Sequence, residues 1–130
     1  MSGDVIRGKR ILVVEDEPLI QGLLSDMLSA DGHEVDAVGT GVAALEKIAE
    51  RSYDLIISDL RMPELDGPGL YRAIESQHKA LLPRMLFVTG SALDPGNEQF
   101  LEETRVPWLS KPFKMTDLHN LTQRVLRSNL

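Results

Sequence analysis

The sequence contains no cysteine, which excludes both a disulfide framework and a thiolate metal site. No apolar run is long enough to cross a membrane, and the first ten residues lack the apolar segment of a secretion signal. Lys and Arg form no block, and 20 acidic against 14 basic residues give a net charge of -6. This balance argues against direct nucleic-acid binding. We therefore expect a cytoplasmic protein with no nucleic-acid or membrane partner.

Histidine is also scarce, and its three positions show no spacing that is typical of metal ligands. We expect His33, His78 and His119 to be solvated. A chain of 130 residues with 42% hydrophobic content is suited to one domain with one compact core. We expect that domain to span residues 1–130, with residues 1–8 as a flexible tail.

Short apolar runs recur along the chain, and each is followed by a segment with helical spacing. The runs at residues 10–14, 55–57, 85–88 and 106–109 predict strands, and the alternating segment 35–38 predicts a weaker one. Thr40 and Asp66 are expected to cap helices, and Pro18, Pro68 and Pro95 suit first turns. The apolar positions of the five predicted helices are Leu19, Ile20, Leu23, Leu24, Met27 and Leu28; Leu45, Ile48 and Ala49; Leu70, Ala73 and Ile74; Phe100 and Leu101; and Leu118, Leu121 and Val125.

Five strands that alternate with five helices through short loops predict an α/β fold with a doubly wound parallel sheet. With the strands numbered along the chain, the flavodoxin-like order 2-1-3-4-5 fits five strands. This order places the first and third strands side by side. It therefore brings Glu15 and Asp16, which follow the first strand, close to Asp59, which follows the third.

Three neighbouring carboxylates repel one another, and a bound cation relieves that repulsion. An all-oxygen site with open positions suits Mg²⁺, which favours one or two carboxylates together with a phosphate. Lys111, at the end of the last strand, and Thr89, at the end of the fourth, can reach the same edge and contact phosphoryl oxygens. Asp59 is then the central carboxylate and the best-placed nucleophile for phosphoryl transfer.

Each of these residues alone is more often a cap or a turn residue. Their arrangement is more informative, because four strands each end in a residue type that phosphoryl transfer requires. The motifs resemble those of response-regulator receiver domains of bacterial two-component and phosphorelay signalling, over nearly the whole chain. They are Val13-Val14-Glu15-Asp16-Glu17, the segment from Asp59 to Gly67, Val88-Thr89-Gly90 and Lys111-Pro112-Phe113.

The resemblance implies that Asp59 accepts a phosphoryl group from a histidine kinase or a histidine phosphotransfer protein. It further implies that Asp16, Asp59 and the backbone carbonyl of Arg61 bind Mg²⁺, with Glu15 acting through water. Thr89 and Lys111 would contact the phosphoryl group. No separate substrate would be turned over, so the chain would not be an enzyme in its own right.

The resemblance also implies a cis peptide bond between Lys111 and Pro112, and a downstream protein partner or a homodimer through the last helix-strand-helix face. The family usually has Tyr or Phe three residues before the lysine as a rotameric switch, acting with the threonine, and here that position is Trp108. The segment 89–96 is more similar to receivers attached to hybrid sensor kinases than to those attached to DNA-binding domains.

Two alternatives from other classes remain. The segment from Gly39 through Gly41 to Ala44 fits a dinucleotide fingerprint of the NAD type, with Asp59 about 20 residues further on. This alternative leaves Thr89 and Lys111 without a function. The strand that precedes the fingerprint, at residues 35–38, also lies at the edge of the predicted sheet. The second alternative is a pseudo-receiver that only docks partners, which the complete acidic set argues against.

Overall fold

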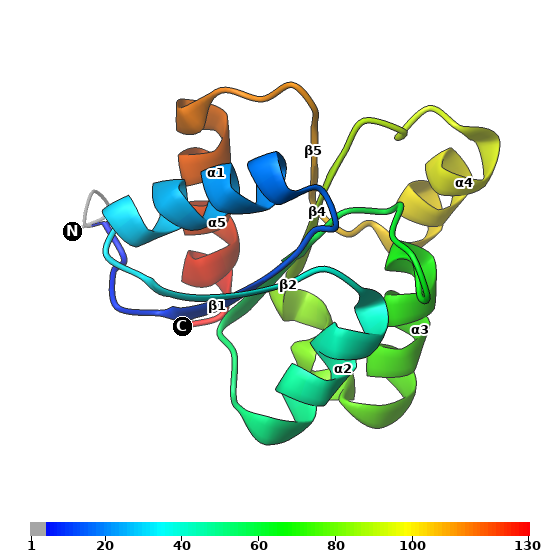
Figure 1. Ribbon diagram of the computed structural model, residues 1–130, viewed down its shortest axis with the longest axis horizontal. Helices are drawn as coiled ribbons and strands as arrows, with labels where there is room; N and C mark the ends of the chain where they lie inside the picture. Colours follow the sequence, from blue (N-terminus) through cyan, green and yellow to red (C-terminus); the bar gives the residue numbers. More distant parts are fainter. Residues whose placement is uncertain (1–4) are drawn as a thin grey trace.

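The computed structural model describes residues 5–130, in which strands alternate with helices (Figure 1). The strands are β1 (Arg10–Val14), β2 (Glu34–Val38), β3 (Leu55–Ser58), β4 (Met85–Thr89) and β5 (Trp108–Ser110). The helices are α1 (Pro18–Ala30), α2 (Gly41–Glu50), α3 (Gly67–Gln77), α4 (Pro95–Thr104) and α5 (Met115–Ser128). A 3₁₀-helix, η1 (Lys79–Arg84), precedes β4 and is an addition to the predicted elements. Val106 lies before β5 rather than in it.

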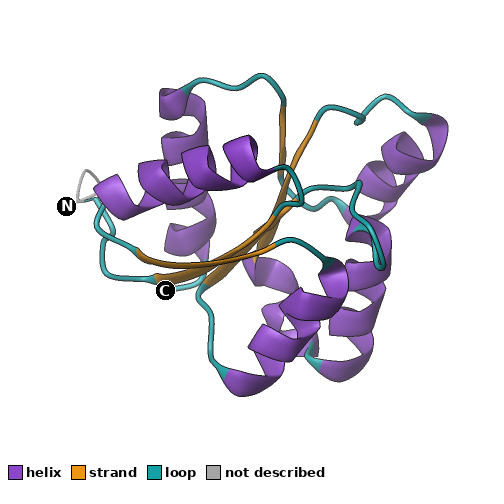
Figure 2. Ribbon diagram, in the orientation of Figure 1, coloured by secondary structure: helices purple, strands orange, loops and turns teal. Residues whose placement is uncertain are grey.

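All strand pairings are parallel, and the sheet order is β2-β1-β3-β4-β5. The predicted fold class and strand order are thus confirmed. Val14, the last residue of β1, lies opposite Ser58, the last residue of β3. The residues that follow these two strands therefore emerge beside each other at the carboxyl edge of the sheet. Figure 2 shows the strands in the centre of the molecule with helices on both sides.

Two apolar layers hold the helices on the sheet. Ile11 and Val13 of β1 pack in a cluster with residues of α1 and α5. Leu12 and Val14, which alternate with them along the strand, pack with residues of α2, α3 and α4 on the opposite face. Figure 1 shows the same division, with α1 and α5 on one side and the other helices below and to the right. None of the helices within residues 5–130 has the length and apolar character that a membrane crossing requires.

Two predicted helix caps are present. Thr40 Oγ1 accepts a hydrogen bond from the backbone nitrogen of Ala43 at 3.0 Å, and Asp66 Oδ1 accepts one from Gly69 at 2.8 Å. Each cap satisfies a backbone donor that the first helical turn leaves unpaired. The second cap fixes the start of α3 directly after the loop that contains Asp59.

The buried face of α1 is narrower than the sequence suggests. Leu24, Met27 and Leu28 are buried, but Leu19 is 84% exposed and Leu23 is 47% exposed. At about 100° per residue, Leu23 lies about 100° and Leu19 about 140° from Leu24 around the helix, so both fall outside the stripe that faces the sheet. The prediction that both belong to the buried face is therefore wrong.

Two residues of the expected flexible tail over residues 1–8, Ile6 and Gly8, form hydrogen bonds with the rest of the fold. The side-chain amide of Gln123 on α5 forms two hydrogen bonds with the backbone of Ile6. Gln123 Oε1 accepts from the Ile6 nitrogen at 2.8 Å, and Gln123 Nε2 donates to the Ile6 carbonyl at 2.9 Å. Gly8 donates to the Gly32 carbonyl at 2.9 Å. Residues 1–4 of the expected tail lie outside the described residues.

His33 is buried, with 6% of its surface exposed, so the expectation that it is solvated is wrong. Its Nδ1 accepts a hydrogen bond from the Lys9 backbone nitrogen at 3.2 Å. His119 Nδ1 lies 2.8 Å from Asp31 Oδ2, which links α5 to the end of α1. The N-terminal segment thus packs over His33 and closes this end of the sheet.

Candidate functional site

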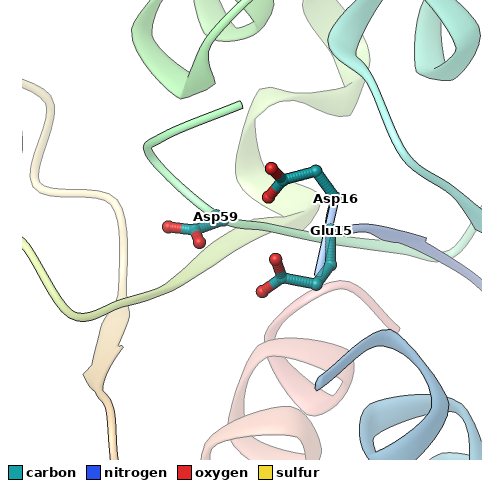
Figure 3. A group of neighbouring side chains, drawn as sticks. All are labelled: Glu15, Asp16 and Asp59. Carbon is teal, nitrogen blue, oxygen red and sulfur yellow. The ribbon is translucent and has the colours of Figure 1, made fainter. Parts of the chain in front are cut away.

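Three carboxylates meet where β1 and β3 end. Asp59 donates its backbone N–H to the Val14 carbonyl at 3.1 Å, which extends the pairing of the two strands by one residue. Carboxylate oxygens of Glu15, Asp16 and Asp59 all lie within 4.8 Å of one another. Figure 3 shows these side chains in the loops that leave the two strands. The predicted cluster is therefore formed by the sheet order itself.

The Asp59 carboxylate is held at both oxygens. Oδ1 accepts from the backbone nitrogens of Leu60 at 2.6 Å and Arg61 at 3.3 Å. Oδ2 accepts from Lys111 Nζ at 2.9 Å, and the side chain remains 11% exposed. These donors stabilise negative charge on Asp59 and fix its orientation while leaving it within reach of solvent.

Lys111, which directly follows β5, contacts two carboxylates of the cluster. Its Nζ lies 2.6 Å from Glu15 Oε1 as well as 2.9 Å from Asp59 Oδ2, with 17% of its side chain exposed. Burial lowers the pKa of Lys111, but the hydrogen bonds and charges of Glu15 and Asp59 outweigh it and raise the pKa above its usual value. The ammonium therefore stays protonated. The peptide bond to Pro112 is cis, as the resemblance implies.

Glu15 is the buried member of the cluster, with 2% of its side chain exposed. Burial raises its pKa more than the hydrogen bonds and charge of Lys111 and the hydrogen bond from the Glu17 backbone lower it. Its Oε2 accepts from the Glu17 nitrogen at 3.1 Å, so both oxygens already have donors. Asp16, by contrast, is exposed, and none of its carboxylate oxygens accepts a hydrogen bond described within residues 5–130.

This donor set fits a hard divalent cation. Three carboxylates offer oxygen ligands only, and Mg²⁺ prefers such ligands and retains part of its water shell. Asp16 is exposed and Asp59 is partly accessible, whereas Glu15 is saturated by Lys111 and Glu17. The geometry therefore favours Asp16 and Asp59 over Glu15 for direct contact with a cation.

Thr89 ends β4 and is fully buried. Its Oγ1 accepts from the Ser91 backbone nitrogen and lies 3.0 Å from the Ser91 hydroxyl. Asn97 Nδ2 in turn donates to the Ser91 carbonyl and hydroxyl oxygens, each at 3.0 Å. Sequence patterns predict a functional role for Thr89 but not for Ser91 or Asn97. A hydroxyl two residues after Thr89 and an amide in the next helical turn are weak signals, since both are ordinary near helix starts.

Arg61 and Trp108, two further residues predicted from the sequence, have exposed side chains. Arg61 forms an exposed ion pair with Asp94 at 2.8 Å, and its backbone nitrogen donates to Asp59 Oδ1 at 3.3 Å. Trp108 is 42% exposed and therefore turned outward. It borders a cleft of about 270 Å³ with Ala92, Leu93, Glu98, Leu101, Glu102 and Arg105.

The glycine fingerprint has a packing explanation. A Cβ on Gly41 would collide with the backbone of Leu65 in the loop after β3. Gly41 also follows β2, which is an outer strand of the sheet and is separated from β3 by β1. The fingerprint thus allows α2 to approach that loop closely, which accounts for the glycine without a dinucleotide.

Comparison with known proteins agrees with this geometry. The family model described as response regulator receiver domain matches residues 11–123. Response regulator protein FleR of Pseudomonas aeruginosa is 35% identical over 115 residues, which are 88% of this chain and 24% of FleR. The receiver protein CpdR of Brucella abortus is 32% identical over 118 residues, covering 91% of this chain and 97% of CpdR.

A solved structure shows the same fold. The receiver domain of a sensor histidine kinase from Pseudomonas aeruginosa superposes with a TM-score of 0.83 at 32% identity, covering 92% of this chain and 98% of that one. That structure contains a magnesium ion coordinated in its active-site cleft. The chain spans about a quarter of the length of FleR, whereas it matches CpdR over almost its full length. The chain belongs to the response regulator receiver domain family of two-component signalling.

Proposed function

We propose that this receiver domain accepts a phosphoryl group on Asp59 from a phosphohistidine of a histidine kinase or a histidine phosphotransfer protein. The observation that carries the proposal is the contact of Lys111 with both Asp59 and Glu15 beside an exposed Asp16. This arrangement combines a nucleophile, a fixed positive charge and oxygen ligands at one edge of the sheet. Relatives that are sensor kinases support a phosphorelay setting.

The transfer step needs little beyond positioning. A carboxylate oxygen of Asp59 forms a bond to phosphorus as the bond from phosphorus to the imidazole nitrogen breaks, and the imidazole leaves with that electron pair. Bound Mg²⁺ would neutralise the charge that develops on the phosphoryl oxygens. Asp16, Asp59 and the Arg61 carbonyl are the proposed ligands, with Glu15 acting through water.

Lys111 and Thr89 complete the proposed phosphoryl site. The Lys111 ammonium already lies 2.9 Å from Asp59 and can turn from the carboxylate to a phosphoryl oxygen. Thr89 ends the strand next to β3 and can supply a hydroxyl donor. In this proposal the phosphorylated state changes the surface that a downstream protein or a second copy recognises. The domain turns over no separate substrate and acts in the cytoplasm.

The test uses Mg²⁺ and a small phosphodonor such as phosphoramidate. Intact-mass measurement is expected to show one added phosphoryl group, which hydroxylamine removes and which Asp59→Asn lacks. Asp66→Asn is the matched control, because Asp66 lies in the same loop but caps α3. An absence of phosphoryl uptake by the parent would instead support the pseudo-receiver. Equal uptake by Asp59→Asn would reject Asp59 as the acceptor.

A further inference from the structure

A chain of three hydrogen-bonded residues joins the buried end of β4 to the first turn of α4. The Thr89 hydroxyl lies 3.0 Å from the Ser91 hydroxyl, and Asn97 Nδ2 lies 3.0 Å from the Ser91 hydroxyl oxygen. Asn97 is the third residue of α4, and its side chain reaches back over the β4–α4 loop. We call these residues the Thr89–Ser91–Asn97 chain.

The hydrogen bonds of this chain hold the Thr89 hydroxyl toward Ser91. The Ser91 carbonyl can only accept, so the Asn97 amide must face it with its nitrogen. The same nitrogen donates to the Ser91 hydroxyl oxygen, while Thr89 Oγ1 accepts from the Ser91 backbone nitrogen. Thr89 is fully buried, which excludes solvent as a substitute partner. The contacts with the Ser91 nitrogen and hydroxyl hold Thr89 Oγ1 toward Ser91, and its movement toward a group on Asp59 breaks them.

We propose that Asn97 is a positioning residue that holds Ser91, and through it the Thr89 hydroxyl, in the unphosphorylated arrangement. This inference rests on the proposed function, because it assigns a task to Asn97 only if a phosphoryl group on Asp59 recruits Thr89. Recruitment breaks the link between Thr89 and Ser91 and frees the loop that leads to α4. The chain thereby couples Asp59 to the first turn of α4.

The surroundings of α4 are consistent with such a movement. A cleft of about 350 Å³ lies between the β3–α3 loop and the first turn of α4, and Asn97 and Gly96 line it. The ion pair of Arg61 with Asp94 crosses this cleft, and its side chains are 75% and 50% exposed. Exposed pairs of this kind contribute little to stability. The hydrogen bonds of the chain through Ser91 are partly buried, and they restrain this turn more strongly than the exposed ion pair.

Beryllofluoride with Mg²⁺ is the probe, because it mimics a phosphoryl group on a carboxylate. Asn97→Ala and Ser91→Ala should each bind it roughly three- to tenfold more tightly than the parent, since each removes part of a restraint on Thr89. The double variant should resemble the single variants, because both act through the same chain. Ser91→Thr, which keeps a hydroxyl, should restore the parent affinity.

Gln99→Ala is the matched control, because Gln99 is an exposed amide on the same helix and bonds only Glu103 in the described hydrogen bonds. It should bind beryllofluoride like the parent. Parent affinity in both Asn97→Ala and Ser91→Ala, or an equal gain in Gln99→Ala, would overturn the coupling. If the parent binds beryllofluoride no better than Asp59→Asn does, both the proposed function and this inference are rejected.

A second readout is independent of affinity. In the parent, the two side-chain amide proton resonances of Asn97 should shift when beryllofluoride binds, because the Ser91 hydroxyl that accepts from this amide loses its contact with Thr89. The side-chain amide of Gln99 should not shift. If parent binding leaves the Asn97 resonances in place, the chain does not open and the inference is wrong, whatever the affinities of the variants.

Discussion

Lys111 Nζ lies 2.9 Å from Asp59 Oδ2, across 52 positions of sequence. The contact depends on the strand order, because β5 and β3 lie on either side of β4. It places a protonated amine at the carboxylate that we propose as the phosphoryl acceptor. The first prediction follows from removing this amine.

Lys111→Ala should still take up a phosphoryl group but transmit the change poorly. Without the ammonium, no group from β5 contacts the phosphoryl oxygens, so the backbone amide shifts of β5 and α5 on phosphorylation should be smaller than in the parent. The variant also leaves Glu15 buried beside Asp59 without its cation, which should lower the free energy of unfolding by about 1–3 kcal/mol. Lys114→Ala, at an exposed lysine of the next loop, is the control. Full amide shifts in Lys111→Ala would contradict the assigned role.

Asp16 and Glu15 should contribute unequally to the affinity for Mg²⁺. Asp16→Ala should weaken Mg²⁺ binding more than Glu15→Ala, because Asp16 is exposed and unengaged while both oxygens of Glu15 have donors. Titration of amide resonances with Mg²⁺ gives the two dissociation constants. Equal weakening would show that the direct and the water-mediated positions are wrongly assigned.

His33 should make the fold sensitive to mild acid. Burial lowers the pKa of His33 below 6.5, and its Nδ1 must stay unprotonated to accept from Lys9. The unfolded chain then binds the proton more readily, so stability falls as pH drops below about 6.5. The charged groups that face His33 are Arg7, Asp31, Asp54 and His119.

Urea unfolding at about pH 7.5 and about pH 5.5 tests this dependence. The loss of unfolding free energy between the two values should be larger in the parent than in His33→Gln, which cannot titrate. His78→Gln, at a partly exposed histidine outside this cluster, should behave like the parent. Equal losses in the parent and His33→Gln would show that another group controls the acid response.

Trp108 should report the switch by its fluorescence, because it is the only tryptophan. In the unphosphorylated structure it is 42% exposed beside the cleft that includes Ala92 and Leu101. We expect beryllofluoride with Mg²⁺ to draw the indole into this space, with a blue-shifted emission and less quenching by acrylamide. Unchanged emission alongside confirmed binding would mean that Trp108 stays outward and that Thr89 and Lys111 act without it.

Local patterns predicted the fold because β1, β3 and β4 are short apolar runs with a polar residue at or directly after their ends, and β2 alternates polar and apolar residues. The order of the strands then brings Glu15, Asp16 and Asp59 together without further information. What the sequence did not predict depends on contacts between distant segments. The pairing of Ile6 with Gln123 spans 117 positions, and it converts an apparently polar tail into a docked segment.

The same limit applies to burial. His33 is polar and has few apolar neighbours in sequence, and it is buried because the segment before β1 covers it. Leu19 and Leu23 fit a helical repeat but lie outside the face that meets the sheet. The link from Asn97 to Ser91 joins a helix to the preceding loop, and neither residue type is unusual there.

The most direct measurement locates the phosphoryl group. Borohydride reduces an aspartyl phosphate to homoserine, and tandem mass spectrometry of peptides then identifies the modified position. After treatment with Mg²⁺ and phosphoramidate, homoserine should replace Asp59 and no other aspartate, and omission of Mg²⁺ should suppress the signal. Homoserine at Asp16 in place of Asp59, or none at either position, would contradict the account.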